Sequence, residues 1–290
     1  PATRVFVTDN ASGDGSETTI PAAIQSNNWS AWATFMPLAR NGGFAYGNNQ
    51  AIRAVLADPA PPKYVWLLNP DTVVVRGALK QLVDYLDRHE HIGIVGSGVI
   101  NPDRTIRRSA FRFHTIASEF ESAANVGPVS SALSKYIVAP PVRDEEHETD
   151  WVSGASMFVR REVFERIGLL DDGYFMYFEE ADFCLRARRA GFRVWYVPGP
   201  KIVHLVGQSS GVTGTKKVAK RRPKYWFDSR HRYFLRNHGL VVTLLADVAW
   251  GAGLVVRKVW DTLRRRPQYD SPGLLWDFVR YNLLSWRQGR

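Results

Sequence analysis

The chain has 290 residues, of which 45% are hydrophobic and 12% aromatic, and this is enough for a large buried core in one or two domains. This composition excludes a disordered or fibrous protein, and the single cysteine, Cys184, excludes an intramolecular disulfide framework. The formal charge of +10 belongs to the tail, because residues 216–290 hold 17 Lys+Arg and 5 Asp+Glu, whereas residues 1–215 carry a net charge of −2.

The first predicted strand, 5–8, ends in the polar turn 9–16, which is rich in Asp, Asn, Ser and Gly. Such a turn is either an anion- or nucleotide-binding loop or a plain turn. The pair Gly42-Gly43 then opens a predicted helix, and glycines at a helix start let a ligand approach the free N–H groups. The G-x-G-x-x-G dinucleotide fingerprint is absent.

The apolar run 64–68 is stopped by Asn69-Pro70-Asp71. This pattern predicts a strand that delivers Asp71 to the C-terminal edge of a sheet, where open α/β sheets bind ligands. Turn chemistry alone explains the same three residues equally well. A predicted helix at 78–88 and a strand at 92–95 follow, and this order predicts an α/β fold with a mostly parallel sheet flanked by helices.

Residues 101–149 lose this periodicity and form a long excursion that includes the charged run 144–148. We interpret this run as an exposed loop and not as a metal site, because nothing apolar holds its acids and histidine on one face. The pattern at 151–159 again predicts a strand, and a short helix is predicted at 161–167 that ends at Gly168.

An aromatic run then leads into Glu179, Glu180 and Asp182, in the first turn of a helix predicted to reach about Ala190. The helix dipole accounts for three acids at this place. Carboxylates at an apolar edge can also have the raised pKa that a general base needs. A further strand at 192–197 is predicted to end at Pro198, shortly before the lone His204.

The basic tail suits an anionic partner, but it has no zinc-finger, RNP or basic-zipper pattern, so we expect no nucleic acid. Its basic aromatic part, 216–236, is either a lid over a substrate diphosphate or a solvated basic face. The apolar run 240–256 is short for a membrane span and carries Asp247 near its centre. Neighbouring cations and tryptophans, Trp286 included, favour a helix on an anionic membrane surface. The alternative is a helix packed on the catalytic domain or on a second copy of the chain.

An ordered set of motifs over residues 4–210 resembles glycosyltransferase family 2, with bacterial rhamnosyltransferase-like and galactofuranosyltransferase-like members closest. The segments that carry the resemblance are 9–16, 41–45, 68–71, 153–157, 178–186 and 203–204. The resemblance implies a GT-A catalytic domain over 1–210, followed by a basic helical region over 211–290. It also implies a strand, a turn and a helix before Val5 that this sequence lacks, so we expect a truncated chain or another segment in that place.

The resemblance further implies inverting transfer from a nucleotide-diphosphate sugar with Mn²⁺ or Mg²⁺. Asp71 and His204 match metal ligands, and an imidazole ligand favours Mn²⁺. Glu180 matches the catalytic base, with Asp182 and Glu179 as the alternatives. The positions expected near the donor are Asp9, Asn10, Asp14, Asn41, Gly43, Asn69 and Asp71. Those expected near the acceptor are Trp151 and Gly154.

We therefore expect a peripheral enzyme on the cytoplasmic face of the cell membrane. It would move a sugar from a dTDP-rhamnose-like or UDP-sugar donor to a lipid-linked or polysaccharide acceptor in cell-envelope glycan synthesis. One rival is a sugar nucleotidyltransferase, which would carry a Gly-rich, Lys-bearing loop near the N-terminus. The other is a noncatalytic binding or assembly protein on the same fold, which would not turn over the donor.

Overall fold

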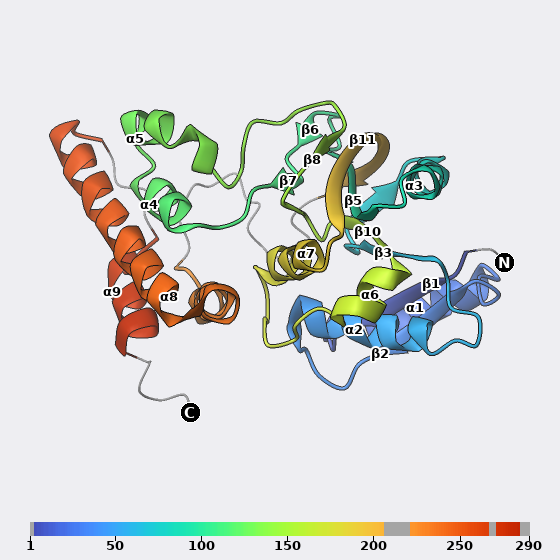
Figure 1. Cartoon of the computed structure of the whole chain (residues 1–290). Coiled ribbons are helices and arrows are strands. Elements are labelled where there is room, and N and C mark those ends of the chain that lie inside the picture. The colour runs from blue at the N-terminus through green and yellow to red at the C-terminus, as the bar shows by residue number, and fades with distance from the viewer. Residues whose placement is uncertain (1–2, 206–220, 267–270, 285–290) are drawn as a thin grey trace.

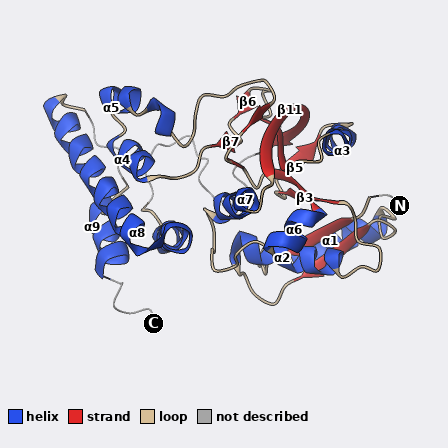
Figure 2. Cartoon of the chain, in the orientation of Figure 1, coloured by secondary structure: helices blue, strands red, loops and turns tan. Residues whose placement is uncertain are grey.

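A computed structural model describes residues 3–205, 221–266 and 271–284 (Figure 1). The predicted lid residues 216–220, Trp286 and the predicted domain boundary at 210/211 lie outside these ranges. Strands, helices and loops are distinguished in Figure 2. The strands are β1 (Val5–Asp9), β2 (Ala33–Pro37), β3 (Tyr64–Leu68), β4 (Thr72–Val74), β5 (Ile92–Ile100), β6 (Ile106–Arg107), β7 (Ala110–Phe111), β8 (His147–Glu148), β9 (Trp151–Val152), β10 (Ser156–Arg160) and β11 (Arg193–His204). The helices are α1 (Ser16–Ser26), α2 (Gly43–Leu56), α3 (Ala78–Arg88), α4 (Ile116–Ala124), α5 (Gly127–Ala132), α6 (Arg161–Ile167), α7 (Glu179–Arg189), α8 (Lys224–Leu263) and α9 (Leu274–Phe278), with short turns at Ser134–Tyr136 and Val279–Leu284.

The main sheet has the strand order β3-β10-β5-β11-β4, with β6 on β5 and β8 on β11. Strands β3, β5 and β11 run in one direction, because β10 is antiparallel to both β3 and β5 and β11 is parallel to β5. The α/β fold with flanking helices is therefore confirmed, but the sheet is mixed and not mostly parallel. The reason is that β10, which comes late in the chain, is inserted between the strands that the β3-α3-β5 unit places in parallel.

Strands β1 and β2 pair in parallel and form a second, two-stranded sheet. Among the described residues, β1 has no strand partner besides β2, and β3 has none besides β10. The edges of β1 and β3 are thus both unpaired.

Alternate residues of the central strands pack on opposite faces of the main sheet, as the period of two requires. On one face, Met157 and Val159 contact the cluster formed by α2, α6 and α7. On the other face, Phe158 and Val95 pack against the apolar stripe of α3. The main sheet is thereby held between two helical layers, and its strand ends are free to carry the polar residues described below.

Strand β11 continues through Pro198-Gly199-Pro200 to His204, so the predicted strand end at Pro198 is wrong. A register shift between Val197 and Lys201 accommodates the two prolines, which cannot donate to the ladder. At this bulge a side chain on Gly98 would place its Cβ 2.5 Å from the Pro198 carbonyl oxygen. The extension brings His204 to the strand end that the site needs.

Helix α8 is long and is interrupted at Gly239, whose φ of 78° lies in the left-handed region that favours glycine. Its second half packs along α4 (Figure 1). The fully buried Arg230 joins the two, because its guanidinium contacts Glu119 of α4 and Asp247 of α8, each at 2.5 Å. Asp247, which the apolar pattern placed inside a membrane-facing segment, thus points into the protein.

Candidate active site

Asp71 and His204 lie side by side because β4 and β11 pair antiparallel with Thr72 opposite His204. His204 Nε2 lies 3.0 Å from Asp71 Oδ1, and the Leu205 N–H donates to the Asp71 carbonyl at 2.8 Å. Asp71 is buried, and the buried His204 Nδ1 has no hydrogen-bond partner within the described chain. The two residues predicted as metal ligands are therefore brought together at a strand end.

A carboxylate oxygen and an imidazole nitrogen in contact are a donor pair that suits Mn²⁺ and also, less well, Mg²⁺. Within residues 3–205, 221–266 and 271–284, no group of three or more His, Cys, Asp and Glu side chains is placed to hold a metal. The pair thus fits an ion that takes its other ligands from water and from a substrate. Donor phosphate oxygens are suitable ligands of that kind.

The acid pair Glu179-Glu180 begins α7 directly after two residues with left-handed backbone, Tyr177 at φ 72° and Phe178 at φ 69°. Such a conformation is unfavourable for large side chains and concentrates at functional sites. Glu180 Oε1 accepts a hydrogen bond of 2.9 Å from the Gly154 N–H. A Cβ on Gly154 would lie 2.8 Å from this oxygen, so only glycine leaves room for the contact.

Burial raises the pKa of Glu180, although the Gly154 N–H opposes this by stabilising the charged form. The pKa of Glu179 is raised well above the usual value, first by burial and then by the negative charge of Glu180. Glu179 is only 2% exposed, and its Oε2 has no partner among the described residues. The pKa is thus raised in both acids and more strongly in Glu179, whereas the Gly154 N–H stabilises the charged form of Glu180.

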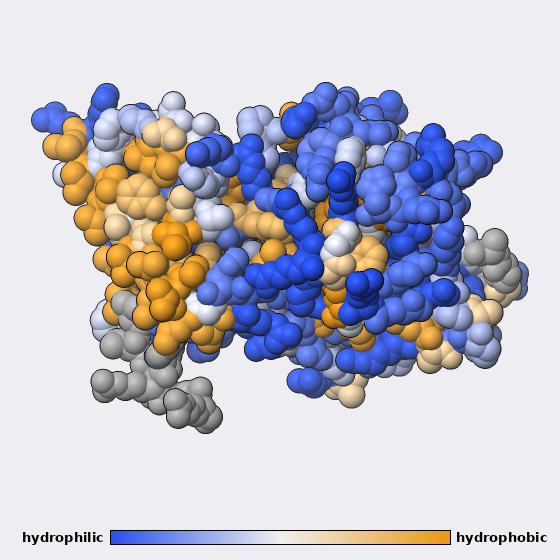
Figure 3. All heavy atoms as spheres, in the orientation of Figure 1, coloured by the Kyte–Doolittle hydropathy of each residue, from blue (hydrophilic) through white to orange (hydrophobic). Residues whose placement is uncertain are grey.

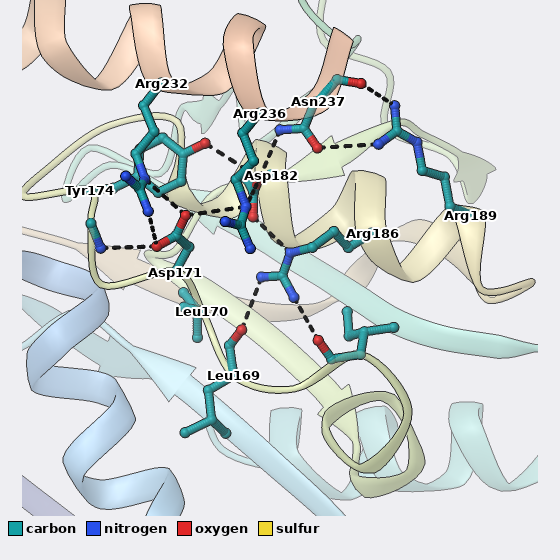
Figure 4. Close-up of polar contacts among 12 residues, drawn as sticks. Leu169, Leu170, Asp171, Tyr174, Asp182, Arg186, Arg189, Arg232, Arg236 and Asn237 are labelled. Carbon is teal, nitrogen blue, oxygen red and sulfur yellow. Dashed lines mark hydrogen bonds and ion pairs between the residues drawn. The ribbon is translucent and has the colours of Figure 1, made fainter. Parts of the chain in front are cut away.

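Asp182, the alternative base, is fully buried and has three hydrogen-bond partners (Figure 4). Arg186 Nε donates to it at 2.8 Å, Asn237 Nδ2 at 2.7 Å and the Tyr174 hydroxyl at 3.3 Å. Arg186 also binds the carbonyl oxygen of Leu169. These contacts fasten α7 to α8 and to the preceding loop, and they favour a structural role for Asp182.

Asp171 is a site-supporting residue that sequence reasoning missed. It accepts hydrogen bonds from Arg232 Nε at 2.9 Å and Nη2 at 2.8 Å, and Arg236 Nε lies 3.3 Å away (Figure 4). Burial alone would raise the pKa of Asp171, but these arginines lower it. The sequence signal that could have indicated an acidic partner is the spacing of Arg232 and Arg236, which lie four residues apart on a basic helix. Helix α8 is thus part of the framework that holds the loop before the acid pair.

The turn after β1 is tied to the start of α2 by Asn10. Its side chain accepts from the Gly42 N–H at 3.2 Å, and donates to the Gly43 carbonyl at 2.9 Å and to Asn41 Oδ1 at 3.2 Å. The Gly43 φ of 87° and its close approach to the Phe175 carbonyl exclude a side chain there. This approach joins the predicted donor loop to the aromatic loop that precedes the acid pair.

The remaining predicted residues differ in exposure. Asp9 is buried and accepts from the Ser12 N–H, whereas Asp14 is exposed and accepts from the Ser16 N–H. The Asn69 N–H donates to the Ala155 carbonyl at 3.4 Å, which links the Asp71 turn to the loop that holds Glu180. The half-buried Trp151 donates from Nε1 to the Arg112 carbonyl at 2.8 Å.

Two curated relatives match a large part of the chain. The N-acetylglucosaminyl-diphospho-decaprenol L-rhamnosyltransferase of Mycobacterium tuberculosis is 27% identical over 278 residues, which cover 90% of this chain and 86% of the relative. The rhamnosyltransferase WbbL of Escherichia coli is 28% identical over 164 residues, which cover 56% of this chain and 60% of the relative.

Solved structures share the fold at low sequence identity. GalNAc-T7 with UDP, GalNAc and Mn²⁺ aligns with a TM-score of 0.52 and 10% identity, over 92% of this chain and 53% of that one. The mannosyltransferase PcManGT of Pyrobaculum calidifontis with GDP-Man and Mn²⁺ aligns with a TM-score of 0.50 and 14% identity, over 99% of this chain and 79% of that one. Residues 32–228, about two thirds of the chain, match the model of the family described as glycosyltransferase like family 2, so the chain belongs to this family and has the GT-A fold.

Proposed function

We propose that the protein is an inverting glycosyltransferase that transfers rhamnose from a dTDP-rhamnose-like donor, with a UDP-sugar as the alternative donor. The acceptor is a hydroxyl of a lipid-linked glycan in cell-envelope synthesis. One observation carries the proposal: the similarity to the mycobacterial rhamnosyltransferase covers 90% of this chain and 86% of the relative. It therefore extends beyond the sheet and its strand-end residues into the C-terminal region.

In the proposed reaction the acceptor oxygen forms a bond to the anomeric carbon while the bond from that carbon to the donor phosphate breaks. The nucleoside diphosphate leaves with the electron pair of the broken bond. Glu180 accepts the proton of the acceptor hydroxyl, which is a contribution of roughly 10²–10⁴-fold in rate. The Gly154 N–H holds the Glu180 carboxylate in position. We assign the neutral, protonated form to Glu179, because its raised pKa favours that form and a neutral neighbour places no second negative charge beside the base.

Asp71 Oδ1 and His204 Nε2 would hold the divalent cation, Mn²⁺ or Mg²⁺. When bound, this ion would offset the charge that develops on the leaving diphosphate. The donor-side residues in the proposal are Asp9, Asn10, Asp14, Asn41, Gly43 and Asn69. Trp151 and Gly154 lie on the acceptor side, next to the base.

We further propose that the protein binds the cytoplasmic face of the membrane through α8. Exposed apolar side chains recur along its second half at helical spacing, at Val241, Leu245, Val248, Val255 and Val259. Figure 3 shows apolar residues gathered over α8, at the left of the view. We call these five residues the α8 stripe.

Helix α8 is long and apolar enough to cross a membrane by length and composition, a test that core helices also pass. A third of its most apolar window is buried inside the protein, which favours a helix lying on the surface. Because Asp247 faces inward to Arg230, the charge that argued against a membrane span does not lie on the α8 stripe. Arg264, Arg265 and Arg266 follow at the end of the helix and suit anionic headgroups.

The test is an assay of the purified chain with Mn²⁺, a panel of nucleotide sugars and a prenyl-diphosphate-linked N-acetylglucosamine acceptor. We expect transfer from dTDP-rhamnose and a loss of at least 100-fold in Asp71→Ala, since removing one metal ligand weakens metal binding and leaving-group stabilisation. Asp84→Ala, which changes a half-exposed acid on α3, is the matched control. Absence of turnover with every donor would favour the noncatalytic alternative, and full activity of Asp71→Ala would reject the metal assignment.

A further inference from the structure

A cavity of about 190 Å³ lies between α4, α8 and α9, and none of the roles assigned above uses it. Its apolar walls are formed mainly by Phe178, Trp226, Trp250, Leu254 and Leu274. Pockets for drug-sized ligands measure about 300–1,000 Å³. This cavity therefore has room for only one part of a long amphiphilic molecule.

Two arginines, Arg222 and Arg257, line the same cavity. The Arg222 guanidinium lies over the Trp226 ring, 4.3 Å from its centroid, and Arg257 Nε is 3.9 Å from Asp261. Guanidinium groups bind phosphate oxygens through paired, charge-assisted hydrogen bonds. Cationic groups above aromatic walls match a ligand with an anionic phosphate head and an apolar chain.

Glu119, the acid in the cavity wall, does not reverse the preference of the cavity for an anionic group. Glu119 is already paired with the buried Arg230, which holds the pKa of Glu119 below its usual value although burial opposes this. His114 Nδ1 lies 3.4 Å from Glu119 Oε1. Among the residues that line the cavity, Arg222 and Arg257 therefore outnumber the single acid, Glu119.

The position of the cavity connects it with both the catalytic site and the α8 stripe. Phe178 directly precedes Glu179, and the His114 ring is 4.6 Å from the Phe178 ring and 6.3 Å from the Trp151 ring. The helical period places Trp250 and Leu254 on the side of α8 opposite to the α8 stripe. A helix is about 10 Å across, so a bilayer on the stripe would lie about that far from the cavity.

We infer that this cavity binds the diphosphate and the first isoprenoid units of a prenyl-diphosphate-linked acceptor. Arg222 and Arg257 hold the phosphates, and the aromatic walls hold the start of the chain. The glycan then extends past Phe178 toward Glu180. This inference rests on the proposed function, because it assigns a place to the lipid part of the proposed acceptor.

The test is a calorimetric titration of the full chain with farnesyl diphosphate in the presence of EDTA, which prevents capture of the diphosphate by a metal at Asp71 and His204. We expect binding that weakens by about 10-fold or more in the double variant Arg222→Gln/Arg257→Gln, a loss of about 1.4 kcal/mol or more. Ser122→Trp, which fills the cavity from an exposed position on α4, should abolish it. Lys80→Gln, which changes an exposed cation on α3, and Asp71→Ala should bind farnesyl diphosphate as the unmodified chain does.

Unchanged affinity in both cavity variants would overturn the inference. So would equal affinity for farnesol, which lacks the diphosphate, or tighter binding of dihexanoylphosphatidylglycerol, which would assign the cavity to a membrane phospholipid. Circular dichroism of each variant confirms that it is folded. The titration needs no sugar transfer, so an inactive protein that binds farnesyl diphosphate would reject the proposed function alone. An active protein that does not bind it would reject the cavity assignment alone.

Discussion

Two clusters of buried and half-buried acids differ in what compensates their charge. At the start of α7, burial raises the pKa of both Glu179 and Glu180, and the negative charge of Glu180 raises that of Glu179 further. Between α4 and α8, Glu119 and Asp247 share the fully buried guanidinium of Arg230. The same type of group is thus uncompensated in one cluster and ion-paired in the other.

This difference separates a chemical site from a structural one. An acid without a nearby cation keeps its proton to a higher pH than an ordinary acid does, and its partner can accept one during a reaction. Glu119, whose pKa is lowered by the buried Arg230, stays charged at neutral pH and joins two helices, so it offers no proton chemistry there. Burial alone therefore does not identify a catalytic carboxylate, whereas burial without a compensating cation favours one.

The largest effect is expected at Glu180. Glu180→Gln removes the proposed base but keeps the size of the side chain and its hydrogen-bonding oxygen, so kcat should fall by about 10²–10⁴-fold. The measurement is transfer at saturating donor and acceptor, with donor binding followed separately.

Glu179→Gln is the matched control, because glutamine resembles the protonated acid that we assign to Glu179. We expect it to retain activity within about threefold, or about 0.7 kcal/mol. The reverse result, an inactive Glu179→Gln and an active Glu180→Gln, would exchange the roles of the two residues.

The second effect tests the compensated cluster. Arg230→Met leaves Glu119 and Asp247 buried without their cation, so the free energy of unfolding should fall by roughly 3–5 kcal/mol. Chemical denaturation monitored by circular dichroism measures it, and the exposed change Arg264→Met should stay within about 0.5 kcal/mol of the unmodified chain. Replacing all three charged residues by apolar ones should recover most of the loss. An Arg230→Met protein of normal stability would show that the ion pairs do not hold α8 on α4.

Local patterns predicted much of the fold and part of the candidate site. The period of α3 gave its bounds, and the strand and turn at 64–71 put Asp71 at a strand end, as the structure shows. The motifs that carried the family resemblance indicated the GT-A fold. These features depend on neighbouring residues, so they can be read from a single chain.

Features that depend on contacts far apart in the sequence were not accessible in this way. No local pattern indicates that β10 lies between β3 and β5, or that β11 passes through two prolines to reach His204. Asp247 was read as a charge within a lipid-facing helix, because its partner Arg230 lies 17 residues away on the other side of the Gly239 break. Among the partners of Asp182, Asn237 is likewise distant, because it lies 55 residues away on α8.

The smallest effect is expected in the Tm when one glutamate of each cluster is replaced by glutamine and the pH is varied. The raised pKa of Glu179 means that the folded state holds a proton that the unfolded state has already released. Stability contributed by this group is therefore lost as the pH rises from the ordinary glutamate value through the raised value of the folded state. Glu179→Gln removes that loss, so it should raise the Tm at pH 8 by about 2–4 °C. This shift corresponds to about 1 kcal/mol in a domain of this size. At pH 4 the same substitution should leave the Tm unchanged. Glu119→Gln should lower the Tm at pH 8, because it removes one of the two charges that compensate Arg230. Thermal unfolding at the two pH values measures both, and a change of the same sign in the two variants would mean that the clusters do not differ in charge compensation.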